Sequence, residues 1–468
     1  MTSNDGSGAT GLIPDSPEPA RTDVKRWLSE RMGWSRLYRS VSYLRSALWG
    51  VPILAVVLER VTYRVLRFLD QWVTWELTGL AVDGAKALFQ TLITLTLSFI
   101  VFSFGSLLVA LQVASAQLTP RIIATTLLRD KVIKYSVGLN VFTLLFAVQG
   151  LNRTDTAVFE LATFTASLLG IACLASFLFF IDHTARLLRP VNIVALVCDQ
   201  GMDVIRNVYP REGAETHSPE IAGQGGSLEV PALVVTHKGR SQIVLAVELD
   251  KLVAEAERAN GVVEFVPQVG DFVATDEPLF KLYGGAATLD EAALRECVAF
   301  GPERTMEQDP MFSFRILVDI ALKALSPAIN DPTTAVLAMD QIHRLLRAVG
   351  RRRLHDEFLH DSSGRVRLVL RTPNWGDFVH IAFTEIRACG ANNVQIARRQ
   401  RAMLENLVRS LPESRHAALT QQLDLLDRTL LEYYKYPEDL ALARIADPQG
   451  LGGAGRGGES ASQAGVAT

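Results

Sequence analysis

Cysteine is scarce in this chain, whose 468 residues include only four, and these lie far apart without forming a CxxC pair. The scarcity argues against a zinc ribbon and against a disulfide framework. The chain also lacks a P-loop, a dinucleotide-binding glycine fingerprint, a nucleophile elbow and an HExxH motif. No plausible set of acid, base and nucleophile stands in their place. We therefore expect a protein that is not an enzyme and that carries neither a metal nor another cofactor.

An excess of either charge is also missing, because 47 basic side chains stand against 50 acidic ones and leave a net charge of -3. A dedicated nucleic-acid binder normally carries a basic excess, so no nucleic-acid partner is expected. Residues 1–20 are polar and have no apolar core, so we expect no cleavable signal peptide and a first membrane span that acts as its own signal.

Long apolar runs, in contrast, are abundant before residue 190. A helix needs about 20 residues to cross the hydrocarbon of a bilayer. Four charge-free intervals approach or exceed that length, between Arg45 and Glu59, Lys86 and Arg121, Lys134 and Arg153, and Glu160 and Asp182. The first is short, and we expect a snorkelling Arg45 or a charged turn at Glu59 and Arg60 to complete it. The sequence therefore predicts a membrane α-helical bundle of four transmembrane helices over residues 46–189.

Tryptophan and the basic residues give this bundle an orientation. Five of the six tryptophans come before residue 76, and residues 23–45 form a basic amphipathic stretch, which indicates a helix on the membrane surface. The alternative is tryptophan in a soluble core. Lysine and arginine concentrate before the first span, between the second and third spans and after the fourth, which places both termini in the cytoplasm. The first external connection is an exception, although acids accompany its basic residues.

After residue 190 the sequence changes to that of a cytosolic α+β region. Residues 229–283 alternate in the manner of β-strands, and 261–282 have the cadence of a small barrel-sandwich module of the biotinyl-lipoyl kind. The lysine that such carriers present at a hairpin tip is absent, which favours a structural role. We predict a disordered N-terminus at 1–22, a helix and linker at 190–228, a small β-barrel-like module at 229–288, a mainly helical domain at 289–446 with a strand at 365–371, and a disordered tail at 447–468.

The second span carries a stripe of small and hydroxylated residues at helical spacing. Such a stripe suits close helix packing or a hydrated pore wall, and the apolar outer end of the span favours packing. The stripe consists of Thr96, Phe99, Ser103, Ser106, Ala110, Ala114 and Gln117, of which Thr96, Ser103, Ser106 and Gln117 are the pore-lining or helix-packing candidates. The fourth span repeats small residues at Ala162, Ala166 and Gly170, as helix-helix contacts do.

Arg60, Arg64 and Arg67 share one helix face beyond the first span. Facing an aqueous vestibule, they would concentrate anions. The alternative is an amphipathic helix on lipid headgroups.

In the cytosolic part, Arg315, Asp319 and Lys323 form a line of charges at a spacing of four residues on an otherwise apolar helix. Buried charges must be paired, either within the chain or across a subunit contact. Ser326, Asn330 and Asp331 follow, and Asp331 before a proline fits a helix N-cap while Asn330 suits a left-handed turn. A structural hinge or a ligand site would explain them.

The segment at 355–361 invites a metal interpretation because it contains His355 and His360. The two histidines are five residues apart instead of four, which makes a shared ligand face poor and favours a solvated segment.

Two stretches, 102–132 and 304–335, resemble the paired signatures of the bacterial family called domain of unknown function 2254. The resemblance extends from about residue 36 to residue 447. It implies a multi-pass protein of the cytoplasmic membrane and supplies no established activity. The second signature corresponds here to Gln308, Asp309, Arg315, Asp319, Ser326, Asn330 and Asp331.

These features favour an integral protein of the bacterial cytoplasmic (inner) membrane that acts as an oligomeric ion channel or permeation protein with a cytosolic regulatory domain. The alternative is a membrane-anchored ligand-sensing or scaffold protein without a pore. The expected partners are the lipid bilayer, further copies of the chain, and an ion or small ligand.

Overall fold

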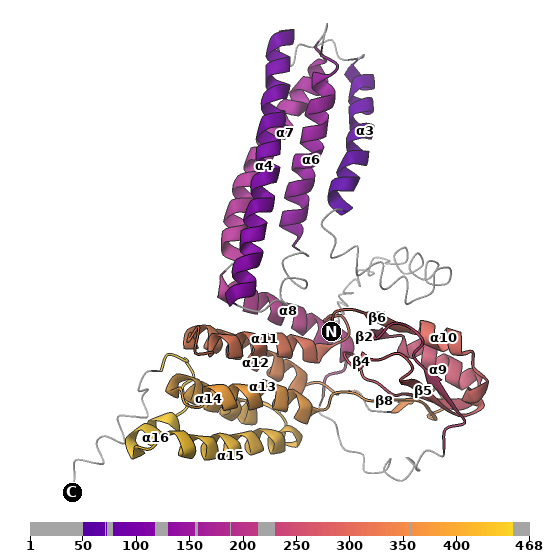
Figure 1. Cartoon of the computed structure of the whole chain (residues 1–468), viewed down its shortest axis with the longest axis vertical. Coiled ribbons are helices and arrows are strands. Elements are labelled where there is room, and N and C mark those ends of the chain that lie inside the picture. The colour runs from indigo at the N-terminus through magenta and orange to yellow at the C-terminus, as the bar shows by residue number, and fades with distance from the viewer. Residues whose placement is uncertain are drawn as a thin grey trace, which may run out of the picture.

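The computed structural model describes residues 50–70, 72, 78–117, 130–154, 158–187, 189–213, 230–354 and 358–452. It has two parts, a bundle of long helices and, beneath it, a body of helices and strands (Figure 1). The predicted surface helix at 23–45, the segment 1–22, residues 453–468 and His355 lie outside the described residues.

The bundle contains helices α3 (Gly50–Asp70), α4 (Val82–Gln117), α6 (Lys131–Leu151) and α7 (Glu160–Leu187). Three of them include segments long and apolar enough to cross a membrane, namely Val82–Val113, Lys131–Leu151 and Glu160–Arg186. Large apolar side chains cover the outside of α4, where Val101 is 65% exposed and Leu108 is 61% exposed. An apolar exterior of this kind is what lipid requires.

Helix α3 runs through Glu59 and Arg60 without a break, so a charged helical turn extends the short apolar interval, which is one of the two predicted alternatives. The helix can continue because it is amphipathic. Ala55, Glu59 and Tyr63 lie on its buried face, while Arg60 points outward.

Glycines allow the bundle helices to approach closely. A Cβ added at Gly150 of α6 would lie 2.5 Å from the ring of Phe89 in α4, and one at Gly170 of α7 would lie 2.5 Å from Leu92 Cδ2. Ala162 and Ala166 are buried in the same contact region. The small residues of the fourth predicted span therefore form a helix-helix contact within one chain.

Helix α8 (Pro190–Val208) follows α7 almost directly and crosses beneath the bundle, above α11 and α12 (Figure 1). Its apolar face is buried in the largest core among the described residues, together with six further helices. These are α11 (Pro310–Ala324), α12 (Pro332–Gly350), α13 (Trp375–Gly390), α14 (Val394–Ser410), α15 (His416–Tyr433) and α16 (Pro437–Ala443).

The strands form two sheets beside these helices (Figure 1), with the strand orders β1-β5-β3-β8-β7 and β4-β2-β6. Helices α9 (Leu249–Arg258) and α10 (Glu291–Glu296) complete this part and contribute to its own core. The strands are β1 (Leu233–Thr236), β2 (Gln242–Val247), β3 (Gly261–Phe265), β4 (Phe272–Val273), β5 (Pro278–Gly284), β6 (Val298–Gly301), β7 (Phe358–His360) and β8 (Val366–Leu370).

The strand predicted at 365–371 is present as β8 and pairs in parallel with β3, Val263 lying opposite Leu368. The five-stranded sheet thus recruits chain from far beyond the predicted module at 229–288. This long-range pairing ties the sheet to the helical part, because α13 begins only a few residues after β8.

Candidate ligand-binding site

The N-terminus of α11 is built by Asp309 and Pro310. The Asp309 carboxylate accepts a hydrogen bond from the Phe312 N–H at 3.1 Å and forms an ion pair with Arg304. Pro310 occupies the first turn, where its missing N–H leaves no unpaired donor. Asp309 is only 3% exposed, and this burial raises its pKa even though Arg304 and the backbone donors oppose the effect.

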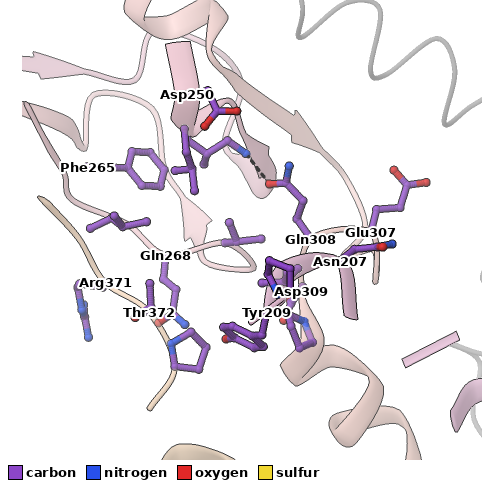
Figure 2. A pocket seen from close by; sticks show the side chains of 18 residues that line it. Asn207, Tyr209, Asp250, Phe265, Gln268, Glu307, Gln308, Asp309, Arg371 and Thr372 are labelled. Carbon is purple, nitrogen blue, oxygen red and sulfur yellow. Dashed lines mark hydrogen bonds between the residues drawn. The ribbon is translucent and has the colours of Figure 1, made fainter. Parts of the chain in front are cut away.

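The side chain of Gln308 connects this helix start to the sheets. Its Oε1 accepts a hydrogen bond from the N–H of Val247, at the end of β2, with a length of 3.0 Å (Figure 2). The adjacent residues Gln308 and Asp309 therefore fix the position of α11 relative to the β part.

A cavity of about 610 Å³ lies at this junction. Figure 2 shows Asp250 at one end of the cavity, Tyr209 at the other, and Gln308 and Arg371 on opposite sides. Its wall draws on the end of α8, the β2–α9 junction, the turn after β3, the start of α11 and the segment after β8. The three units of the body beneath the bundle, which are α8, the sheets and the helical part, therefore share it.

The cavity combines an apolar lining with a few polar groups, as small-molecule sites do. Phe265, Val247 and Leu249 supply apolar surface, while Gln268 and Asn207 supply amides. The structure finds no group of three or more metal-ligating side chains among the residues it describes.

Tyr209 closes one end of the cavity with a buried ring that lies edge-on to Phe378, the centroids being 6.3 Å apart. Burial, together with the nearby Asp309 and Asp377, raises the pKa of the Tyr209 phenol well above its ordinary range. The phenol is therefore neutral at physiological pH and can serve as a hydrogen-bonding group.

The predicted charged line of α11 borders a neighbouring hollow that shares Arg371 with the cavity. Arg315 donates to Asp319 at 2.7 Å and pairs with Glu385 of α13, which lowers the pKa of Glu385. Lys323 is half-buried one turn farther on and has its own interactions. The structure therefore pairs Arg315 within the chain, between α11 and α13.

The residues of the predicted hinge join α11 to α12. Asp331 is the N-cap of α12 and accepts a hydrogen bond from the Thr334 N–H at 3.1 Å, and Asn330 has a positive φ of 48°, as their spacing predicted. The Ser326 hydroxyl donates to the Lys323 carbonyl at 2.7 Å. None of these three residues lines the cavity described above.

The stripe of the second predicted span faces the inside of the bundle. Thr96 and Ser103 are buried, and Phe99 stacks on Phe177 of α7 with the ring centroids 4.0 Å apart. The Thr96 hydroxyl donates to the Leu92 carbonyl at 2.6 Å, and the Ser106 hydroxyl donates to the Ser103 carbonyl at 3.0 Å. The side chain of Gln117 lies outside the described residues, although its backbone ends α4.

Arg60 and Arg64 are exposed on α3, whereas the side chain of Arg67 lies outside the described residues. The structure places Arg60 and Arg64 in the bundle, on α3, and the signature residues of α11 in the body beneath it (Figure 1).

Sequence reasoning missed Tyr209, Phe265 and Arg371, which meet in the cavity although they are far apart in the chain. The predicted signature included Gln308 and Asp309, and these residues do line the cavity. Their position just before a proline-initiated helix was the one available signal.

The family model described as "Predicted membrane protein (DUF2254)" matches residues 45–406. Curated relatives include uncharacterized proteins of Mycobacterium bovis and of Mycobacterium tuberculosis. Each is 27% identical over 426 residues, which cover 86% of this chain and 80% of the relative. No solved structure matches the chain.

Proposed function

This chain belongs to the DUF2254 family of predicted membrane proteins, and from that premise we propose that it is a membrane-anchored sensor of a small ligand. The observation that carries the proposal is the cavity of about 610 Å³ whose wall is shared by α8, the sheets and α11. A ligand bound there would contact every cytosolic unit at once.

A direct connection joins this cavity to the bundle. Helix α7 ends at Leu187 and α8 begins at Pro190, so little chain separates the apolar helix from the helix that forms the cavity wall. The far end of α8 supplies Asn207 and Tyr209 to that wall. A ligand that favours one position of α8 would therefore shift the cytosolic end of α7, which is the differential binding that coupling requires.

The wall also indicates the class of ligand. Apolar side chains dominate it, the Asp309 carboxylate is paired with Arg304, and Asp250 and Arg371 contribute one charge of each sign. We propose a small organic molecule with an apolar body and a neutral or zwitterionic polar group.

The test uses the full chain in lipid nanodiscs and the small-molecule fraction of a bacterial cell extract. We expect the fraction to raise the midpoint of thermal unfolding, because a ligand of the folded state stabilises it. Leu249→Trp, which fills the cavity, should abolish this rise. The matched control is Leu431→Trp, since Leu431 is 57% exposed on α15. A rise of equal size in both variants, or none in the parent chain, would contradict the sensor.

An oligomeric ion channel is the second candidate, and a buried acid in α3 favours it. Glu59 is 1% exposed, and its Oε1 has no hydrogen-bond partner among the described residues. On α6, Asn140 is buried, and its Oδ1 likewise finds no partner in the part of the chain that the structure describes. Ionisable groups inside apolar bundles often mark ion pathways. Thr96, Ser103 and Ser106 are turned toward the chain's own helices, so a pathway along the stripe would run inside the bundle.

Cysteine labelling separates the two candidates. In a cysteine-free background, a channel predicts that cysteines at Ser103 and Ser106 react with a membrane-impermeant thiol reagent and that labelling changes the conductance. The sensor predicts protection at both positions and a silent planar bilayer. A cysteine at the exposed Leu108 controls for lipid shielding.

The remaining parts of the proposal concern setting. We place the protein in the bacterial cytoplasmic (inner) membrane with four crossings, α3 providing the first, and with both termini in the cytoplasm. The lysine and arginine distribution supports this orientation. The proposal further includes a barrel-like β module, assembly into a homo-oligomer, no enzymatic activity and no nucleic-acid partner.

A further inference from the structure

A second hollow in the cytosolic part, of about 370 Å³, is lined by five arginines. It lies between the C-terminal halves of α8 and α12 and shares no lining residue with the proposed ligand cavity. Met202, Ile205 and Ala348 give it an apolar floor, and Glu212 is the acid in its wall. The arginines are Arg206, Arg344, Arg347, Arg351 and Arg352.

Helix geometry brings three of these arginines together. Arg344, Arg347 and Arg351 are spaced by three and four residues at the end of α12 and so share one face. A helix C-terminus attracts cations, which accounts for arginines in the last turn. The same effect accounts for Arg206 in the last turn of α8, but it does not account for Arg344, which comes before the last turn of α12, or for a hollow between the two helices.

Backbone hydrogen bonds hold the segment beyond α12 in place. The Gly213 N–H donates to the Arg351 carbonyl at 3.0 Å, and the Arg353 N–H donates to the Arg211 carbonyl at 3.1 Å. The Arg352 side chain donates to the Tyr209 carbonyl at 2.6 Å. The rim of the hollow is therefore ordered before any ligand binds.

The existing partners leave much of this positive charge uncompensated. Arg344 pairs with Asp199 at 2.8 Å and Arg206 with Asp203 at 3.1 Å, but both pairs are well exposed and therefore weak. Arg352 lies 3.8 Å from Glu212. In the part of the chain that the structure describes, no carboxylate lies within ion-pairing distance of Arg347 or Arg351, and the Arg347 side chain has only a 3.4 Å contact with Asn406 Oδ1.

We propose that this arginine hollow binds a phosphate group. Guanidinium groups present paired N–H donors that match phosphate oxygens, and a hollow ringed by several of them offers more than one such fork. The apolar floor would accept the group to which the phosphate is esterified. Two sources share this chemistry, the headgroup of an anionic phospholipid and a soluble phosphate compound.

The experiment uses the full chain in phosphatidylcholine nanodiscs with two probes, inorganic pyrophosphate and a short-chain phosphatidylglycerol below its micelle concentration. Binding is measured by calorimetric titration. We expect at least one probe to bind, more weakly as salt rises because salt screens the charges. Arg347→Gln and Arg351→Gln should each weaken that binding about tenfold. Binding of pyrophosphate alone identifies a soluble phosphate, and binding of the lipid alone identifies a headgroup.

The matched control is Arg428→Gln, which removes one positive charge from an exposed position of α15. It should bind like the parent chain. Arg347→Lys, which keeps the charge and loses the fork, should bind with intermediate affinity, and thermal unfolding of each variant checks the fold. Failure of both probes to bind the parent chain, or equal weakening by Arg428→Gln, would overturn the proposal.

Discussion

The bundle and the body of helices and strands beneath it bury polar groups with different reach. In the bundle, Thr96 and Thr163 donate to the carbonyls of Leu92 and Phe159, at 2.6 and 2.9 Å, and contacts between helices join short side chains, such as Ser176 with Ser136 at 3.1 Å. In the body beneath it, whole arginines are buried and reach across the sequence. Arg398 is 1% exposed and donates to the carbonyls of Ile445 and Gly452, at 3.0 and 3.1 Å.

The outer surfaces of the two parts differ in the same sense. Val101 and Leu108 project from α4 with more than half of their surface exposed, while the exposed positions of α15 are mixed and include Arg428 as well as Leu431. Where lipid is the neighbour, backbone groups are paired within each helix and apolar side chains can face outward. Where water is the neighbour, a buried charge needs partners that the fold brings from far away. The difference therefore reports the solvent of each part.

Replacing Arg398, which makes long-range hydrogen bonds from a buried position, should cause the largest loss of stability. Arg398→Met removes both long-range hydrogen bonds and leaves the Ile445 and Gly452 carbonyls without that donor. We expect a loss of about 3 kcal/mol, since buried groups left without partners are costly. The measurement is the midpoint of thermal unfolding of the full chain in nanodiscs. Arg428→Met should change it little, because its ion pair is exposed. Equal midpoints for both variants would contradict the comparison.

The solvent division could be predicted from the sequence because it depends on local composition. The charge-free intervals predicted the apolar helices α4, α6 and α7. The Asp331-Pro332 pair predicted the start of α12, since a helix cap is formed by neighbouring residues. The end of α3 was harder to predict from the sequence. Its continuation past Glu59 depends on burial against other helices, which the charge pattern does not show.

The candidate site was only half predictable, for a related reason. Gln308 and Asp309 belong to a compact signature, but Tyr209 and Phe265 reach the cavity through the fold. The parallel pairing of β3 with β8, whose residues are about a hundred positions apart, places Phe265 opposite Leu370 and so brings Arg371 to the cavity. No local pattern encodes which strand a distant segment will join.

Close packing in the bundle can be tested with two glycines that differ only in their neighbours. A Cβ at Gly150 would lie 2.5 Å from Phe89, whereas one at Gly105 would have nothing within 4 Å. Gly150→Ala should destabilise the bundle by about 1–3 kcal/mol through overpacking. Gly105→Ala should be neutral or stabilising by up to about 1 kcal/mol, since alanine favours helix. The thermal midpoint of the full chain measures both, and a reversed order would show that the helices pack differently.

We expect acid to lower the free energy of unfolding of the part that contains α12, because His343 becomes protonated. Burial and the neighbouring Arg399 and Arg347 lower the pKa of His343 to about 4, below the ordinary 6.5. The stability that depends on its neutral form is complete above about pH 6.5 and is lost as the pH falls toward 4. Allowing for partial exposure, we expect a contribution of about 1–2 kcal/mol.

Thermal unfolding between pH 7 and pH 4 measures this dependence. His343→Gln keeps a donor toward Asn406, which His343 contacts at 3.0 Å, and should flatten the pH profile relative to the parent chain. Superimposable pH profiles for the two chains would rule out the role of His343.

Removing a hydroxyl from the bundle should have the smallest effect. Thr96→Val deletes a donor to the Leu92 carbonyl, which is a backbone group of the same helix. That carbonyl lies within a continuous helix and still accepts the backbone N–H four residues later. We therefore expect a change of about 0.5 kcal/mol in the free energy of unfolding. A loss approaching that of Arg398→Met, measured in the same thermal assay, would mean that Thr96 serves a partner beyond its own helix. The hydrogen bond from Thr96 to its own helix would then not describe the main interaction of this fully buried hydroxyl.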